Sequence, residues 1–93
     1  MEDIHNDKFS KSERAAWRTI EGKTIIIDAT NKRALALNET ASVIWEALDG
    51  ESSLKELVIK HIVENYEVKP ETAIQEISEL IAKLYDKGLV TKC

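Results

Sequence analysis

The chain has 93 residues, of which 43% are hydrophobic and 32% are charged, a balance that predicts one folded domain and excludes a disordered tail or a membrane protein. Its 13 basic and 17 acidic residues give a net charge of −4, so it lacks the cationic field that binds phosphate backbones, and nucleic acid is not an expected partner. The single cysteine, Cys93, excludes an internal disulfide and a cysteine-based metal site.

The N-terminal segment differs in pattern from the rest of the chain. Residues 1–14 are polar, carry charges of both signs and lack periodicity, so we expect a flexible arm followed by one domain over residues 15–93. Acidic residues occupy the positions where a secretory signal would have Lys or Arg, and no uncharged run approaches the ~20 apolar residues that span a bilayer. A cytoplasmic protein is therefore expected.

Three strands are predicted next. Residues 16–21 alternate moderately between polar and apolar, residues 23–28 contain a β-branched run, and Glu21-Gly22 between them suits a two-residue hairpin turn. Residues 33–37 place their leucines at a period of two, which predicts a third strand. The three segments indicate an antiparallel meander, whose outer strands have free edges.

Three helices are predicted after the strands, each from a signal at its start or end. Asn38 is a good N-cap for the first helix, and Ser53 with Glu56 forms a capping box for the second. Pro70 suits the first turn of the third helix, and Gly88 suits its C-terminal end. The order indicates an α+β fold, a three-stranded antiparallel meander followed by three helices, which is similar to a winged-helix module.

No group of residues suited to catalysis is visible. The glycines lie at predicted turns and caps, so no glycine-rich phosphate loop is present. His61 lies alone on the apolar stripe of the second helix, and Glu76 and Glu79 lie on the polar face of the third beside lysines, as expected of a solvated surface. We therefore expect no enzyme, no catalytic residues, no metal site and no cofactor.

Several short motifs, taken in order and spacing, resemble those of a known family. The motifs are Leu37-Asn38-Glu39-Thr40-Ala41, Ile44-Trp45, Leu48-Asp49-Gly50, Leu57, Tyr66-Glu67-Val68, Leu80, Leu84 and Lys87-Gly88-Leu89-Val90. Over residues 17–90 the chain resembles the coenzyme PQQ synthesis protein D family. That resemblance implies a recognition element for ribosomally synthesised, post-translationally modified peptides (RiPPs), which captures the leader segment of a precursor peptide and presents the core to a modifying enzyme.

The resemblance also implies a binding mode, in which the leader adds as an antiparallel strand to the third strand and lies in a groove against the third helix. Carried over to this sequence, the binding strand is Arg33, Ala34, Leu35, Ala36 and Leu37, and the groove wall is Ile74, Ile77, Ser78, Ile81 and Tyr85. Backbone pairing at a strand edge and burial of apolar leader side chains are a known mode of peptide recognition.

Alternative functions remain open at this point. The order of elements also allows a winged-helix DNA-binding or transcriptional module, which the acidic third helix disfavours, and a self-associating domain that dimerises through its free edge. The expected partners are the leader of a precursor peptide and a maturation enzyme such as a radical SAM protein, with no nucleic acid and no membrane, for a monomer or weak homodimer. The product can be PQQ or another RiPP.

Overall fold

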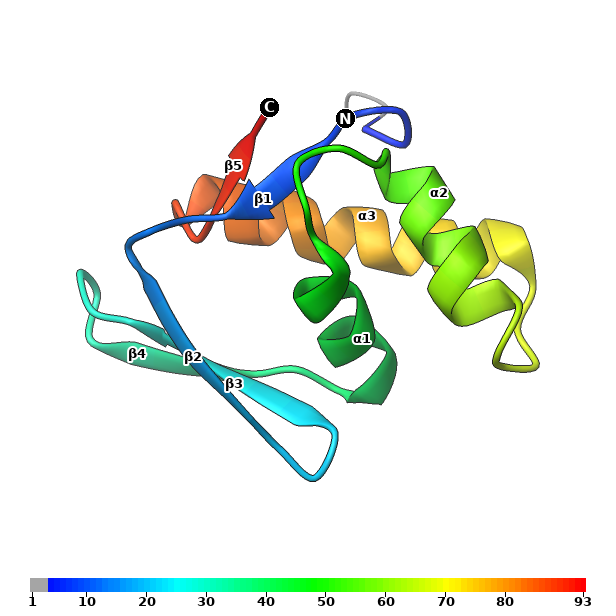
Figure 1. The fold of residues 1–93 in the computed structure, drawn as a ribbon. Coiled ribbons are helices and arrows are strands. Elements are labelled where there is room, and N and C mark those ends of the chain that lie inside the picture. Colours follow the sequence, from blue (N-terminus) through cyan, green and yellow to red (C-terminus); the bar gives the residue numbers. More distant parts are fainter. Residues whose placement is uncertain (1–3) are drawn as a thin grey trace.

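The computed structural model describes residues 4–93. Its elements in chain order are β1 (Phe9–Lys11), β2 (Ala15–Ile20), β3 (Lys23–Asp28), β4 (Arg33–Ala36), α1 (Glu39–Ala47), α2 (Leu54–Val58), the π-helical turn η1 (Ile59–Val63), α3 (Pro70–Asp86) and β5 (Val90–Lys92). Because η1 continues α2 directly, the chain has the three expected helices after a three-stranded sheet, and the predicted α+β fold is confirmed (Figure 1).

The main sheet is the predicted antiparallel meander, with strand order β2-β3-β4. The hairpin between β2 and β3 turns at Glu21 and Gly22, whose φ angles of 52° and 79° are the left-handed values that a tight two-residue turn requires. The inner face of the sheet contains Ile26, which is fully buried, whereas Ile25 and Ile27 on the opposite face are exposed. The sheet is therefore covered on one face only.

A second, two-stranded sheet joins the two ends of the described chain and was not expected from the sequence. β1 pairs antiparallel with β5, and Phe9 lies opposite Lys92. Phe9 is only 3% exposed, and its ring meets that of Tyr85 edge-on at 6.4 Å between centroids. Part of the segment expected to be a flexible arm, residues 1–14, is thus a strand with a core residue. No local sequence pattern indicates that Phe9 is buried. Residues 1–3 lie outside the described residues.

The helix starts follow the predicted capping signals. The Asn38 side chain accepts the Ala41 N–H at 2.9 Å at the start of α1. The capping box at α2 is complete, since the Ser53 N–H donates to Glu56 Oε1 at 2.9 Å and the Glu56 N–H donates to Ser53 Oγ at 3.2 Å. α3 starts at Pro70 as expected.

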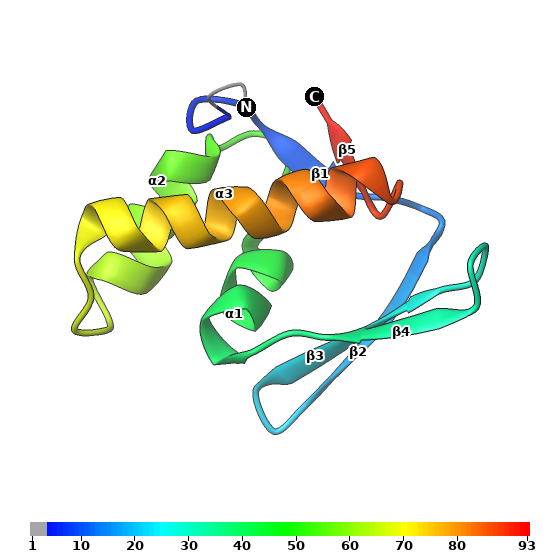
Figure 2. The same cartoon turned by 180° about the vertical axis from the view of Figure 1, so that it is seen from behind.

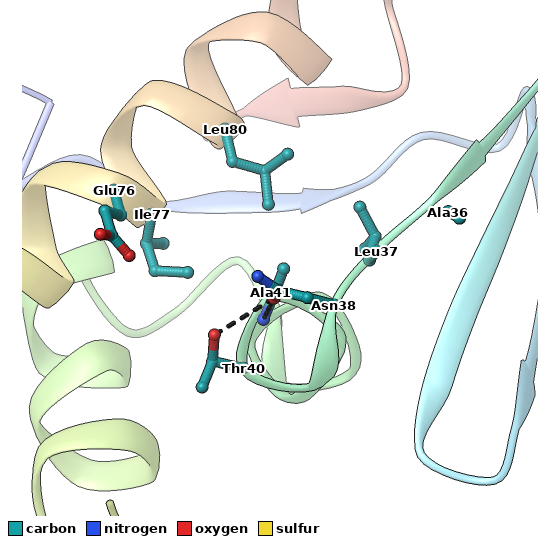
Figure 3. A pocket seen from close by; sticks show the side chains of 8 residues that line it. All are labelled: Ala36, Leu37, Asn38, Thr40, Ala41, Glu76, Ile77 and Leu80. Atoms are coloured by element: carbon teal, nitrogen blue, oxygen red, sulfur yellow. Dashed lines mark hydrogen bonds between the residues drawn. The ribbon is translucent and has the colours of Figure 1, made fainter. Parts of the chain in front are cut away.

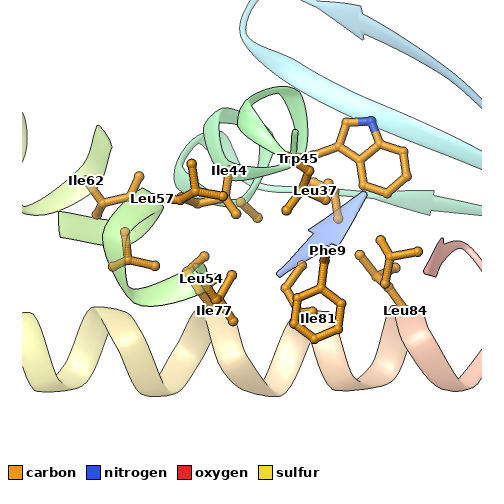
Figure 4. Packing of buried hydrophobic residues seen from close by; sticks show 14 of the residues in the cluster. Phe9, Leu37, Ile44, Trp45, Leu54, Leu57, Ile62, Ile77, Ile81 and Leu84 are labelled. Atoms are coloured by element: carbon orange, nitrogen blue, oxygen red, sulfur yellow. The ribbon is translucent and has the colours of Figure 1, made fainter. Parts of the chain in front are cut away.

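The hydrophobic core lies between α3 and the layer formed by α1, α2 and β1 (Figure 4). Its largest fully buried side chain is Trp45 of α1, which meets the exposed Trp17 of β2 edge-on at 6.1 Å between centroids. Ile81 and Leu84 bring α3 into the same cluster. α1 therefore links the sheet to α3, and Figure 2 shows β4 running toward the start of α1 below α3.

A buried hydrogen-bond chain fixes α1 to the end of the sheet. The Thr24 N–H of β3 donates to Ser42 Oγ at 2.7 Å, and the Ser42 hydroxyl donates to the Asn38 carbonyl oxygen at 2.7 Å. Thr24 is fully buried and Ser42 is nearly so. The chain leaves β4 and enters α1 along a path set by these bonds.

Candidate functional site

Among residues 4–93, no strand pairs with the outer edge of β4, and the hydrogen bonding shows which of its residues face that free edge. The Leu37 N–H donates to the carbonyl oxygen of Thr24 at 2.8 Å, and these residues lie opposite one another because Ile25 pairs with Ala36. In an antiparallel ladder, residues bonded to their opposite partner alternate with residues whose N–H and C=O point away. Ala34 and Ala36 therefore direct their N–H and C=O groups to the free edge.

The side chains of β4 divide between the two faces of the sheet. Leu35 lies opposite the buried Ile26 and points with Leu37 to the inner face. Ala34 and Ala36 lie on the outer face and are exposed. The edge thus offers free backbone groups at the alanines and apolar side chains on the inner face.

A pocket of about 210 Å³ opens where β4 ends (Figure 3). Its walls are Ala36, Leu37, Asn38, Thr40 and Ala41 from the end of β4 and the start of α1, and Glu76, Ile77 and Leu80 from α3. Figure 3 shows Leu80 extending from α3 toward Leu37 and the start of α1, with Glu76 on the same helix. This volume is below the ~300–1,000 Å³ of drug-sized sites and suits one apolar side chain.

The pocket and the free edge are continuous, because Ala36 belongs to both. The start of α1 is held in place by Asn38, whose Oδ1 accepts the Ala41 N–H and, at 3.2 Å, the Thr40 hydroxyl. Asn38 therefore caps α1 and lines the pocket at once. A strand on β4 would lead one of its side chains directly into this space.

The structure places the sequence-predicted groove residues of α3 in three different surroundings. Ile77 lines the pocket and is 5% exposed, whereas Ile74, Ser78 and Ile81 are buried and outside its walls. Tyr85 is 50% exposed and lies at a different pocket, of about 180 Å³, between α3 and the β1–β5 sheet. Of the predicted wall, only Ile77 meets the end of β4.

Five lining residues were not predicted as site residues: Asn38, Thr40, Ala41, Glu76 and Leu80. Leu80 lies three residues after Ile77, the spacing of neighbours on one helix face, and that spacing could have identified it. The residues at the start of α1 follow Leu37 directly, so their position beside the strand could also have been expected.

The opposite end of β4 is electrostatically different from the pocket end. Arg33 lies opposite Asp28, whose carboxylate is buried and accepts the Asn31 side-chain amide at 2.8 Å. Hydrogen bonding, chiefly from the Asn31 side chain, holds the pKa of Asp28 below its usual value, and the positive charge of Lys87 lowers it further. Asp28 therefore keeps its negative charge at the end of β3, next to the β3–β4 turn.

Asp28→Asn is expected to make the free energy of unfolding less sensitive to acid. Because the pKa of Asp28 is lower in the folded chain than the ~3.9 of an unfolded chain, its stabilisation is present above that value and is lost as pH falls through the folded pKa. Urea unfolding at about pH 7 and about pH 2.5 measures the difference, which should be smaller in the variant. An equal acid loss in both proteins would show that Asp28 contributes nothing to it.

The described residues contain no metal-type cluster. No group of three or more His, Cys, Asp or Glu residues within residues 4–93 is placed to bind a metal ion. None of the helices in this part of the chain is long and apolar enough to cross a membrane.

The family model of coenzyme PQQ synthesis protein D matches residues 23–90, which include β3, β4, all the helices and the start of β5. The chain belongs to the coenzyme PQQ synthesis protein D family. The predicted resemblance is thus confirmed. The sequence matches none of the curated proteins with which it was compared.

Two solved structures share the fold of this family member. TbiB1 in complex with the TbiA(beta) leader peptide has a TM-score of 0.74 at 18% identity, covering 87% of this chain and 93% of that one. Lasso peptide synthetase B1 complexed with the leader peptide has a TM-score of 0.75 at 20% identity, covering 90% of this chain and 98% of that one. At these identities, the likeness establishes the shared fold.

Proposed function

We propose that this chain is a non-catalytic RiPP recognition element that acts in the cytoplasm, binds the leader of a ribosomally made precursor and presents it to a maturation enzyme. The observation that supports this function best is the continuity of the free β4 edge with the pocket between α1 and α3. Family membership and the fold shared with two leader-binding proteins agree with it.

The geometry of the edge supports strand addition as the binding mode. A leader strand would bond to the N–H and C=O groups of Ala34 and Ala36, and each net hydrogen bond contributes ~0.5–1.5 kcal/mol. Backbone hydrogen bonds of this kind give little selectivity for the leader sequence. An apolar leader side chain in the pocket formed by Leu37, Ile77 and Leu80 would supply selectivity, because full burial of one Leu or Phe contributes ~1.5–3 kcal/mol.

Proline substitutions along β4 test strand addition, since proline removes the backbone N–H. Ala34→Pro and Ala36→Pro are expected to leave the fold intact and to weaken leader binding by about tenfold or more, because their N–H groups face the free edge. Leu35→Pro is expected to lower the free energy of unfolding by about 1–3 kcal/mol, because its N–H faces β3.

The measurement is fluorescence anisotropy with labelled leader peptides, taken from the N-terminal segments of short open reading frames identified beside the gene for this chain. Urea unfolding reports stability in parallel. Thr19→Pro is the matched control, because in the β2–β3 register its N–H faces the other free edge of the sheet. Unchanged affinity in both alanine variants, or an equal loss in Thr19→Pro, would exclude strand addition to β4.

A further inference from the structure

The register of β4 fixes which leader side chains point inward, given the proposed mode of binding. In a leader strand bonded to Ala34 and Ala36, every second residue lies opposite Arg33, Leu35 or Leu37. The side chains of those leader residues point to the inner face. The residue opposite Leu37 therefore meets the pocket, and the residue opposite Arg33 is four positions away along the leader.

The edge of β4 has opposite charges near its two ends. Glu76 lines the pocket end and is exposed. Arg33 at the other end is exposed, and Lys87, just after α3, is close enough to influence Asp28, the residue opposite Arg33. A leader on this edge thus meets a carboxylate at one end and basic groups at the other.

The basic groups at the Arg33 end outnumber Asp28, the carboxylate that lies opposite Arg33 and beside Lys87. In the part of the chain that the structure describes, neither Arg33 nor Lys87 forms a salt bridge, and the oxygens of Asp28 accept hydrogen bonds from Asn31. Arg14 adds a third cation at this end, since its Nη2 donates to Thr30 Oγ1 at 2.7 Å in the β3–β4 turn. Three cations beside the Asp28 carboxylate leave an excess of positive charge here, which a carboxylate on the leader could meet.

We propose that the β4 edge and its pocket select an antiparallel leader with an acidic residue against Arg33 and Lys87, four residues C-terminal to the apolar residue that fills the pocket. The direction follows from the antiparallel pairing, which places the N-terminal part of the leader at the pocket. A basic residue on the N-terminal side of the apolar residue is compatible with Glu76. Charge order along the leader then determines which precursors bind and in which orientation.

A positional scan of the leader peptide tests this selection. Each leader residue is replaced in turn by Leu, Glu and Lys, and affinity is measured by anisotropy. We expect one position that accepts only apolar residues and, four residues toward the C-terminus, one position where Lys binds about tenfold more weakly than Glu. In Arg33→Glu, the preference at that second position should reverse to favour Lys.

Lys87→Glu provides a second charge reversal, just after α3, in case Arg33→Glu folds poorly. It should shift the preference at the same leader position in the same direction. Lys55→Glu is the control, because Lys55 is exposed on α2 and changes the net charge equally. A scan without a charge-sensitive position, or with the acidic position N-terminal to the apolar one, would overturn the proposal. If the leader binds and Ala34→Pro and Ala36→Pro weaken it, such a result rejects only the charge order; if the leader does not bind, the proposed function fails first.

Discussion

Ile81→Asp is expected to unfold the domain, whereas Leu80→Asp, one residue earlier on α3, is expected to leave it folded and to remove most of its affinity for the leader. Ile81 is fully buried in the core, and an unpaired charge in an apolar interior costs more than a small domain can tolerate. Leu80 is half-buried at the pocket, where an added carboxylate stays hydrated until an apolar leader side chain arrives.

Circular dichroism and anisotropy with the leader peptide separate these two effects. The loss of one buried leader contact in Leu80→Asp, ~1.5–3 kcal/mol, corresponds to an affinity roughly 10- to 150-fold weaker. Leu80→Met is the control that keeps an apolar side chain of similar volume. A folded Leu80→Asp with unchanged affinity would mean that the leader does not use this pocket.

Phe9→Ala is expected to lower the free energy of unfolding by about 3–5 kcal/mol, which is a large share of the ~5–15 kcal/mol typical of a whole domain. Phe9 is buried in the core and anchors the strand that pairs with β5. Urea unfolding followed by tryptophan fluorescence measures the loss, since Trp45 is buried in the folded domain.

The matched control for this prediction is Tyr85→Ala, which removes the exposed partner of the same ring contact and should cost much less. Phe9 does not line the pocket at the end of β4, so folded Phe9→Ala protein should bind the leader normally. A variant as stable as the parent would show that β1 is dispensable, as expected for the flexible arm.

The sequence predicted those parts of the fold that depend on local signals. The caps at Asn38 and Ser53 and the proline at the start of α3 each act within one helical turn, so the helix starts could be identified. β1 and β5 could not, because each strand has three residues and pairs with a segment some eighty positions away in the chain. No local period reveals such a pairing.

The site was predictable to the same extent. The free edge of the third strand followed from the meander, but the residues that face it are known only from the β3–β4 pairing, as the Leu37 N–H bond to the Thr24 carbonyl oxygen shows. On α3 the apolar stripe is wide enough that Leu80 and Ile81 look alike in sequence. Only the position of α1 decides that Leu80 faces the pocket and Ile81 the core.

The hydrogen bonds that join Thr24, Ser42 and Asn38 have a thermodynamic consequence for leader binding. They hold the end of β4 against α1 before any peptide arrives, so the domain presents its half of the interface in a preorganised state. The conformational entropy lost on binding then belongs mainly to the leader, which must become extended. Leaders rich in β-branched residues, which already favour an extended chain, should for that reason bind more tightly even where those residues contact nothing.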